Sequence, residues 1–417
     1  MARQRRDARR PPATGHRPHL ATQYPRPKET RLPRPTLASL AGELAVSRQT
    51  ISNVLNAPHK VRPATRERVQ AAIAAAGYRP SAAARQLRTR RSMNLGMRLL
   101  PATNGINGAV LDRFLHALTE ASQSAGYRLT LFCADSDRDE IRQYGQLLDV
   151  AGLDGFILTS STPDDPRTRW LQERGTPFAV FGRPWDAAGH PAAADHPWVD
   201  VDGAAGTEAA VQMLLAQGHS RIGFLGWFTG DPVGADRRRG WERAMTAAGR
   251  GQDVPGLSVE AEDTVAGGAS GAGLLASRGA TAMVCSSDSL ALGAMEKLRE
   301  SRRGGSSSGQ AAGRGARPGA GPDGPSGRTA VVGFDNTPVA AALGLSSVAQ
   351  PVEEAARHII RVLAYELAES GSLAGSGTGR TAGGALTAAP APPERQLLLA
   401  PRVVERIPLP LAAPGSS

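Results

Sequence analysis

The chain has 417 residues, of which 49 are Lys or Arg and 38 are Asp or Glu, for a formal net charge of +11. This length suits two or three domains. It holds no run of about 18 apolar residues and does not open on a signal-peptide pattern, so we expect a cytoplasmic protein without a membrane span. Its two cysteines, Cys133 and Cys285, lie in apolar strand-like segments. We expect both to be core residues, and neither a disulfide nor a metal site.

The positive charge is concentrated at one end of the chain. Residues 1–91 carry 20 Lys or Arg against 4 Asp or Glu, whereas the other 326 residues carry 29 against 34. Such an end attracts a polyanion. A membrane surface would attract it too, but the lack of a long apolar run favours DNA as the partner.

Residues 1–35 are rich in Arg and Pro and show scarcely any apolar periodicity, so we expect a disordered basic arm. Two roles are open for this arm. It is either a solvated tail or a segment that adds sequence-independent contacts to DNA phosphates.

Residues 36–80 predict a helix-turn-helix DNA-binding domain. Apolar residues at helical spacing predict the inner faces of two short helices, with Leu37, Leu40, Ala41 and Leu44 in the first and Ile51, Val54 and Leu55 in the second. Ser47 stands where the N-cap of the second helix belongs. Arg48, Gln49 and Asn53 are left on its outer face, as in a helix that enters the major groove. Ordinary packing of two helices is the alternative explanation of the apolar pattern.

The body of the chain, residues 92–407, alternates strand-like and helical segments. The strand-like segments include RLTLFCA, GFILTSS, PFAVFG, RIGFLGW, TAMVCSS and TAVVGFD. Short apolar runs separated by helices predict parallel sheets with crossover helices, and the length favours two lobes rather than one. Residues 301–328 and 371–393 are rich in Gly, Ser and Pro and predict flexible insertions, the first of which could also be a regulatory loop. Residues 408–417 form a short tail.

Several motifs along residues 36–407 occur in the order found in one known family. They include TLASLAGELAVSRQTISNVLN, GHSRIGFLG, RRRGWERAM, SSDSLALGAM, VVGFDN and LLLAPRVVER. With them the chain resembles the lactose-repressor (LacI/GalR) family of transcription regulators. The resemblance implies an α-helical helix-turn-helix headpiece, followed by a two-lobed α/β domain like that of periplasmic binding proteins with a small effector between the lobes. It also implies a dimer, sometimes a tetramer.

Position by position, the resemblance implies DNA contacts around the second helix. Arg48, Gln49 and Asn53 match positions that read base edges, and Arg and Gln side chains can pair bidentately with guanine and adenine. Ser47, Thr50, Ser52 and Asn56 match positions that bind phosphates and set the docking register. Thr36 and Leu37 are also expected to contact DNA. N-capping and solvation of the helix surface are alternative roles for these polar residues.

Residues 81–91 resemble the hinge helix of the family, which folds on the operator. The resemblance gives DNA contacts to Ser81 and Ala84, and makes Leu87 the residue that is inserted into the minor groove. An ordinary apolar linker residue is the alternative for Leu87. Two residues depart from the family pattern, because Ala45 stands where a turn glycine is usual and Ser81 replaces an Asn. A positive φ at Ala45 would be strained.

The resemblance also implies an effector site lined by Arg183, Trp185, Trp227, Arg237, Ser287, Asp288 and Asp335. Asp335 is the position that accepts hydrogen bonds from ligand hydroxyls. Asp288 follows a strand at the carboxyl edge of a sheet, where ligands bind in open α/β folds, but it could equally N-cap the next helix. Trp185 and Trp227 offer aromatic faces suited to a sugar ring, with a core role as the alternative.

We therefore expect a homodimeric regulator that binds a pseudo-palindromic DNA operator and acts as a sugar-responsive repressor without a cofactor. A transcriptional activator of the same family is the alternative. An α/β enzyme fits less well, because the sequence contains no G-x-S-x-G, P-loop or H-E-x-x-H motif. The segment LGWFTGDPVG also lacks the G-x-G-x-x-G spacing of a dinucleotide-binding turn.

Overall fold

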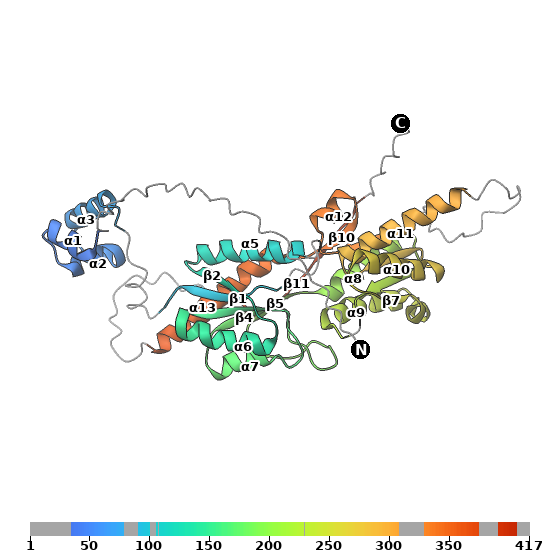
Figure 1. Cartoon of the computed structure of the whole chain (residues 1–417), viewed down its shortest axis with the longest axis horizontal. Helices are drawn as coiled ribbons and strands as arrows, with labels where there is room; N and C mark the ends of the chain where they lie inside the picture. Colours follow the sequence, from blue (N-terminus) through green and yellow to red (C-terminus); the bar gives the residue numbers. More distant parts are fainter. Residues whose placement is uncertain are drawn as a thin grey trace, which may run out of the picture. The chain divides into compact units, whose positions relative to one another are not determined.

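A computed structural model of the chain describes residues 35–78, 91–100, 106, 108–228, 230–307, 329–374 and 391–406 (Figure 1). Its contacts divide the chain into two compact units. The first contains the helical headpiece, and the second contains the α/β body. The predicted arm, the predicted hinge helix, the tail and most of both predicted insertions lie outside the described residues.

The headpiece has three α-helices, namely α1 (Leu37–Glu43), α2 (Arg48–Asn56) and α3 (Pro63–Ala75), with a short 3-10 turn at Pro58–Lys60. Leu40, Ile51 and Val69, one from each helix, have at most 1% of their surface exposed and form the centre of the core. The other apolar residues predicted for the two inner faces pack around them. The predicted helix-turn-helix pattern is therefore confirmed as the packing of this unit.

Lobe 1 of the body is built on a fully parallel six-stranded sheet in the order β11-β5-β4-β3-β1-β2. Its strands are β1 (Asn94–Arg98), β2 (Arg128–Phe132), β3 (Gly155–Thr159), β4 (Phe178–Phe181), β5 (Trp198–Val201) and β11 (Gln396–Leu399). Helices α5 (Gly108–Ser124) and α13 (Val352–Ala374) pack on one face. Helices α6 (Asp137–Gln146), with the π-turn Leu147–Ala151, and α7 (Pro166–Glu173) cover the other.

Lobe 2 has a second six-stranded sheet in the order β12-β10-β9-β8-β6-β7. Its strands are β6 (Ile222–Gly226), β7 (Ser258–Glu260), β8 (Ala282–Cys285), β9 (Ala330–Phe334), β10 (Ser346–Ala349) and the antiparallel edge strand β12 (Arg402–Val404). The flanking helices are α8 (Gly203–Ala216), α9 (Pro232–Ala247), α10 (Val265–Ser277), α11 (Asp288–Ser307) and α12 (Pro338–Ala342), with a 3-10 segment at Gly251–Gly256. The buried indole of Trp241 donates to the carbonyl of Ile222 at 3.0 Å and ties α9 to the sheet.

The chain passes between the lobes three times. It enters lobe 2 at Asp202, between β5 and α8, and returns to lobe 1 at residues 350–351, between β10 and α13. It crosses again at residues 400–401, between β11 and β12. Because only these short segments join the lobes covalently, a change in the angle between the lobes is a bend at these three places.

The six predicted strand segments and the parallel pairing are confirmed. The expectation for Cys133 was wrong, because this residue lies just beyond the end of β2 and is exposed, whereas Cys285 in β8 is buried. Helices α11 and α13 continue to Ser307 and Ala374, so each runs several residues into a segment predicted as an insertion. Within the described ranges, no helix is both long and apolar enough to span a bilayer.

Candidate operator-binding and effector-binding sites

Helix α2 presents the side chains predicted to read base edges. The hydroxyl of Ser47 accepts from the backbone N–H of Thr50 at 3.0 Å, which confirms Ser47 as the N-cap. Arg48 and Gln49 are exposed, and Gln49 lies on the side of the helix opposite the buried Ile51. Gln49 Nε2 donates to Asn53 Oδ1 at 2.9 Å, which fixes the relative position of two amides one turn apart. Both amides have the donor and acceptor groups that adenine recognition requires.

Several of the other residues predicted to contact DNA also have folding roles. Thr36 caps α1 through reciprocal hydrogen bonds with Ser39. The Leu37 side chain packs against the headpiece core, and the Thr50 hydroxyl lies 2.9 Å from that of Ser47. Ser52 is half-buried on α2, and Asn56 is the last residue of this helix. Ser81, Ala84 and Leu87 lie outside the described residues.

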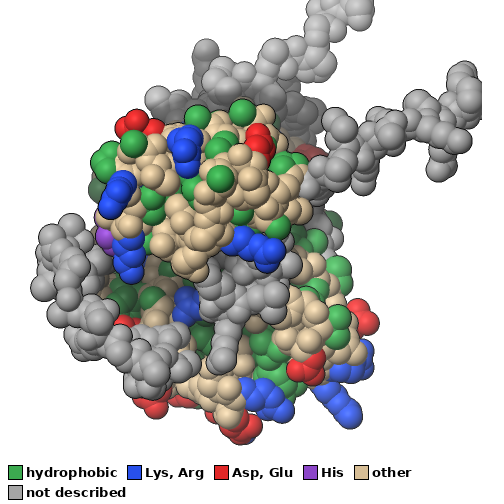
Figure 2. All heavy atoms as spheres, turned by 90° about the vertical axis from the view of Figure 1, so that its left-hand side faces the viewer, with side chains coloured by type: hydrophobic (Ala, Val, Ile, Leu, Met, Phe, Trp, Pro, Cys, Tyr) green, Lys and Arg blue, Asp and Glu red, His purple; other side chains and the backbone are tan. Residues whose placement is uncertain are grey.

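Most of the basic charge lies outside the folded headpiece. Residues 35–78 carry five Lys or Arg and two Asp or Glu, whereas residues 1–34 carry ten and two. On the face shown in Figure 2, Lys and Arg side chains stand at separate points among hydrophobic and neutral ones. The described headpiece therefore has a helix that can enter a DNA groove and a modest net positive charge, rather than a dense basic patch.

The turn between α1 and α2 is strained at Ala45, which has a φ of 51°. Because the left-handed region costs a residue with a Cβ roughly 1–2 kcal/mol, we expect Ala45→Gly to stabilise the headpiece by about 1 kcal/mol. Hydrogen exchange at the Ile51 and Val69 amides of the intact protein measures this. Ala72→Gly in the middle of α3 is the control, which should lower protection. Unchanged or lower protection in Ala45→Gly would contradict the prediction.

In lobe 2, Arg237 on α9 lies among the residues predicted to bind the effector. Its guanidinium is 3.7 Å from the centre of the Phe334 ring and 4.9 Å from that of Trp227, and it donates to the carbonyl of Ser286. A further nitrogen, Nη2, lies 3.9 Å from the Asp335 carboxylate. Among the described residues, Arg237 Nε and Trp227 Nε1 have no hydrogen-bond partner, so both donors suit ligand oxygens.

Asp335 follows β9 and is only 6% exposed. It accepts a 2.6 Å hydrogen bond from Gln350 on the second chain crossing. Burial raises the pKa of Asp335 to about 7, although nearby Arg237 lowers it. The backbone at Asp335 has a φ of 106°, a conformation that is costly for a non-glycine residue and is found mostly at functional sites.

Ser287 and Asp288 begin α11 at the end of β8. Ser287 accepts from the Leu290 N–H at 3.2 Å and donates to Asp263, a carboxylate that follows β7. The N-cap role considered for Asp288 therefore belongs to Ser287. The two oxygens of Asp288 accept from the Ser347 hydroxyl at 2.6 Å and the Thr337 N–H at 2.7 Å. These bonds give Asp288 a role in joining the loops of lobe 2.

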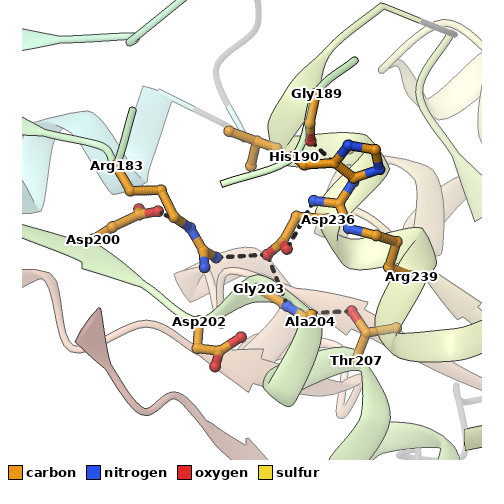
Figure 3. Close-up of polar contacts among 12 residues, drawn as sticks. Arg183, Gly189, His190, Asp200, Asp202, Gly203, Ala204, Thr207, Asp236 and Arg239 are labelled. Atoms are coloured by element: carbon orange, nitrogen blue, oxygen red, sulfur yellow. Dashed lines mark hydrogen bonds and ion pairs between the residues drawn. The ribbon is translucent and has the colours of Figure 1, made fainter. Parts of the chain in front are cut away.

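In lobe 1, Arg183 is held by two carboxylates (Figure 3). Its Nε donates to Asp200 on β5 at 2.9 Å, and its Nη2 donates to Asp236 on α9 at 2.7 Å. Trp185 is 3% exposed, and its ring lies 4.9 Å from the Arg183 guanidinium. A cavity of about 280 Å³ is lined in part by Trp185, Ser161 and Gln172.

Two family models match the sequence. The model for bacterial regulatory proteins of the lacI family matches residues 36–81. The model for periplasmic binding proteins and the sugar-binding domain of the LacI family matches residues 111–312. The chain is also 33% identical over 340 residues to an HTH-type transcriptional regulator of Mycobacterium tuberculosis, covering 76% of this chain and 87% of the relative. The chain belongs to the LacI family of transcriptional regulators. It is therefore a DNA-binding regulator and not an enzyme.

Other members of the LacI family are similar along most of the chain. The regulator CelR of Thermobifida fusca is 32% identical over 342 residues, which covers 79% of this chain and 91% of CelR. A solved structure described as a complex of the transcriptional regulator CelR with cellobiose aligns with a TM-score of 0.57 at 26% identity. The alignment covers 89% of this chain and 99% of that structure.

The structure separates the predicted effector residues of this LacI-family chain into two groups. Trp227, Ser287, Asp288 and Asp335 follow strands of lobe 2, where Arg237 on α9 contacts Trp227 and lies 3.9 Å from Asp335. Arg183 and Trp185 lie in lobe 1. Four polar residues in contact with these groups were not predicted from the sequence, namely Asp200, Asp236, Asp263 and Gln350. One signal was available, since Asp236 directly precedes Arg237 and Gln350 directly follows a strand. Among the described residues, no cluster of His, Cys, Asp or Glu could hold a metal ion.

Proposed function

We propose that this LacI-family chain is a cytoplasmic, sugar-responsive repressor that binds a pseudo-palindromic operator as a homodimer. One observation carries the proposal. A single chain joins the α2 side chains of Arg48, Gln49 and Asn53 to a lobe-2 group in which Arg237, Asp335 and Trp227 lie together. The first group suits base edges, and the second suits a small polar ligand.

The chemistry of the lobe-2 group supports a sugar as the effector. A sugar has hydroxyls that donate and accept hydrogen bonds, and one face of its ring is covered by C–H groups. The Asp335 carboxylate supplies acceptors, the Arg237 guanidinium supplies donors, and the Trp227 ring supplies an aromatic face. The similar CelR structure is described as a complex with cellobiose, which makes this disaccharide a sensible first probe.

The position of Gln350 supports coupling between the effector and the operator. This residue lies on a crossing between the lobes and donates to Asp335, so a ligand that contacts Asp335 acts next to a place where the body bends. We infer that effector binding changes the angle between the lobes and thereby lowers the affinity of the headpieces for operator DNA. Linkage then requires operator binding to weaken effector binding by the same factor.

The recognition-helix assignment is tested by base preference. We expect Gln49→Ala and Asn53→Ala to lose about 1–3 kcal/mol of discrimination at the base pairs each side chain contacts, because a bidentate pair is lost. Footprinting selects the genomic sites, and competition with single-base variants of one site measures the discrimination. Gln70→Ala, an exposed glutamine on α3, is the matched control. Full sequence preference in both α2 variants would refute the assignment.

A further inference from the structure

A compact network of charged side chains connects lobe 1 to lobe 2 (Figure 3). It lies next to Arg237 of the lobe-2 group, because Asp236 directly precedes Arg237 on α9. We call Arg183, Asp200, Asp236 and Arg239 the inter-lobe ion cluster. Arg183 and Asp200 belong to lobe 1, and Asp236 and Arg239 lie on α9 of lobe 2. Two guanidinium groups and two carboxylates make the cluster neutral as a whole.

The link between Arg183 and Asp236 is buried on both sides. The exposed fraction of the two side chains is 8% and 7%, and the Nη2–Oδ2 distance is 2.7 Å. Asp200 also holds the Arg183 guanidinium in position, because it accepts a hydrogen bond from Arg183 Nε at 2.9 Å. A buried pair of this kind depends on both partners, because removing one leaves an uncompensated charge in a poorly solvated site.

Asp236 is bonded to more than Arg183. Its Oδ2 also accepts from the backbone N–H of Ala204 at 3.0 Å, in the first turn of α8 directly after the first chain crossing. Its Oδ1 accepts from Arg239 Nη2 at 3.1 Å. The carboxylate therefore joins the two lobes, the crossing segment and its own helix at one point.

A second contact between the lobes joins a hairpin of lobe 1 to α9 of lobe 2. The loop between β4 and β5 in lobe 1 folds into a small hairpin, in which Trp185 bridges Pro191. At its tip, the carbonyl of Gly189 accepts from Arg239 Nη1 at 3.0 Å. A Cβ at Gly189 would lie 3.9 Å from Cβ of Pro232, the first residue of α9. The hairpin of lobe 1 thus rests on the start of the helix that carries Asp236 and Arg237.

We propose that the inter-lobe ion cluster is a latch that holds the two lobes together, and that Arg183 acts through lobe closure rather than by contacting the effector. Opening the lobes must separate Arg183 from Asp236 and Arg239 from Gly189. The hydrogen bonds that the Arg183 guanidinium donates to Asp200 and Asp236 are both to carboxylates, and both oxygens of Asp236 accept hydrogen bonds from Arg183, Arg239 or the Ala204 N–H. The inference rests on the proposed function, because closure regulates an effector site only if the effector binds between the lobes.

The latch sets the fraction of molecules that are closed, and thereby the apparent affinity for an effector that binds the closed form. Without the latch, fewer molecules would be closed, so the apparent affinity would fall although the contacts of the effector with Arg237 and Asp335 stay the same. This role makes Arg183 and Asp236 positioning residues.

Disulfide trapping measures the closed fraction without DNA or sugar. In a full-length Cys133→Ser background, Gly189→Cys and Pro232→Cys place two sulfur-bearing residues at a Cβ separation within the range of disulfides. The remaining Cys285 is buried. The rate of disulfide formation in a glutathione buffer, followed as loss of alkylatable thiol by mass spectrometry, reports closure. The strain of a Cys at Gly189, whose φ is 75°, is common to all variants compared.

We expect Arg183→Met and Asp236→Asn to slow cross-linking at least about tenfold, because each breaks the buried pair. Asp236→Asn keeps the size of the side chain and so guards against a variant that fails to fold. Arg238→Met is the matched control, since Arg238 lies on the same helix but pairs with Glu242 and Glu260 inside lobe 2. Cross-linking in Arg183→Met or Asp236→Asn at the unsubstituted rate overturns the latch, as does equal slowing in Arg238→Met. Because the assay contains no operator and no sugar, its failure and that of the operator test are distinguishable.

Discussion

An Asp335→Ala variant is expected to bind operator DNA like the unsubstituted protein, but to need at least about tenfold more sugar for release. Asp335 is the buried hydrogen-bond acceptor of the lobe-2 group. A sugar hydroxyl that loses this acceptor weakens sugar binding by roughly 1–3 kcal/mol, or more beside a charge. Arg237→Ala should have a similar effect through the loss of donors and of contact with Trp227. The measurement is a titration of the preformed operator complex, with cellobiose as the first of a panel of sugars.

The same titration at several pH values tests whether the ionised form of Asp335 binds the sugar. With a pKa of about 7, Asp335 is more protonated at pH 6 and more ionised at pH 8. The ionised form accepts hydrogen bonds from a sugar, so the midpoint should fall as pH rises through 7, and Asp335→Asn should remove this step. Since the folded pKa lies above the ordinary 3.8, the contribution of Asp335 to the free energy of unfolding should also decrease as pH rises from about 4 to 7.

Glu242→Ala is the control for these titrations, because Glu242 lies on α9 with Arg237 but pairs with Arg238. It should leave the midpoint unchanged. Equal midpoints in the unsubstituted protein and in the Asp335 and Arg237 variants would remove both residues from the effector site.

Gly240→Ala is expected to destabilise the body by about 3 kcal/mol or more. A Cβ at this position would lie 2.0 Å from the backbone carbonyl oxygen of Ala204, where α9 crosses α8. Backbone cannot rotate away as a side-chain end can, so the helices must separate. Arg237 is less than one turn before Gly240, so the variant should also displace Arg237 from Trp227 and Asp335.

Urea unfolding of the full-length protein measures the loss. Gly273→Ala in α10 is the matched control, because its Cβ would meet only the end of the Lys297 side chain, at 3.7 Å. That change should be neutral or stabilising by up to about 1 kcal/mol, since alanine favours a helix over glycine. Equal unfolding midpoints for Gly240→Ala and Gly273→Ala would show that the two helices are not tightly fixed at their crossing.

The local patterns of the sequence predicted the headpiece well. The spacing of Leu40, Ile51 and Val54 was enough because all three contacts lie within one short segment, and Ser47 capped its helix as expected. The carboxyl ends of parallel strands predicted that Asp288 and Asp335 lie at one edge of a sheet, and these residues do follow the paired strands β8 and β9. Ala45 was expected to be strained if its φ were positive, because the family usually has a glycine there, and its φ is 51°.

The contacts between lobes were not predictable in the same way. Arg183 and Asp236 are 53 positions apart and lie on different sheets, so neither periodicity nor spacing pairs them. Arg183 was assigned to the effector from the family resemblance, which did not indicate its two carboxylate partners. Cys133 was misjudged because an apolar segment was taken as buried to its end, whereas the strand stops at Phe132.

The way the last strands are shared between the lobes has a consequence for biosynthesis. Strand β11 completes the edge of one sheet beside β5, and β12 completes the edge of the other beside β10, yet both belong to one stretch of nine residues, 396–404. During translation the headpiece can fold as soon as it leaves the ribosome, because its core is local. Both sheets, in contrast, keep an unpaired edge until this late segment emerges, and such edges favour aggregation. A nascent chain is thus able to form its DNA-reading helix long before it can form the body that controls it.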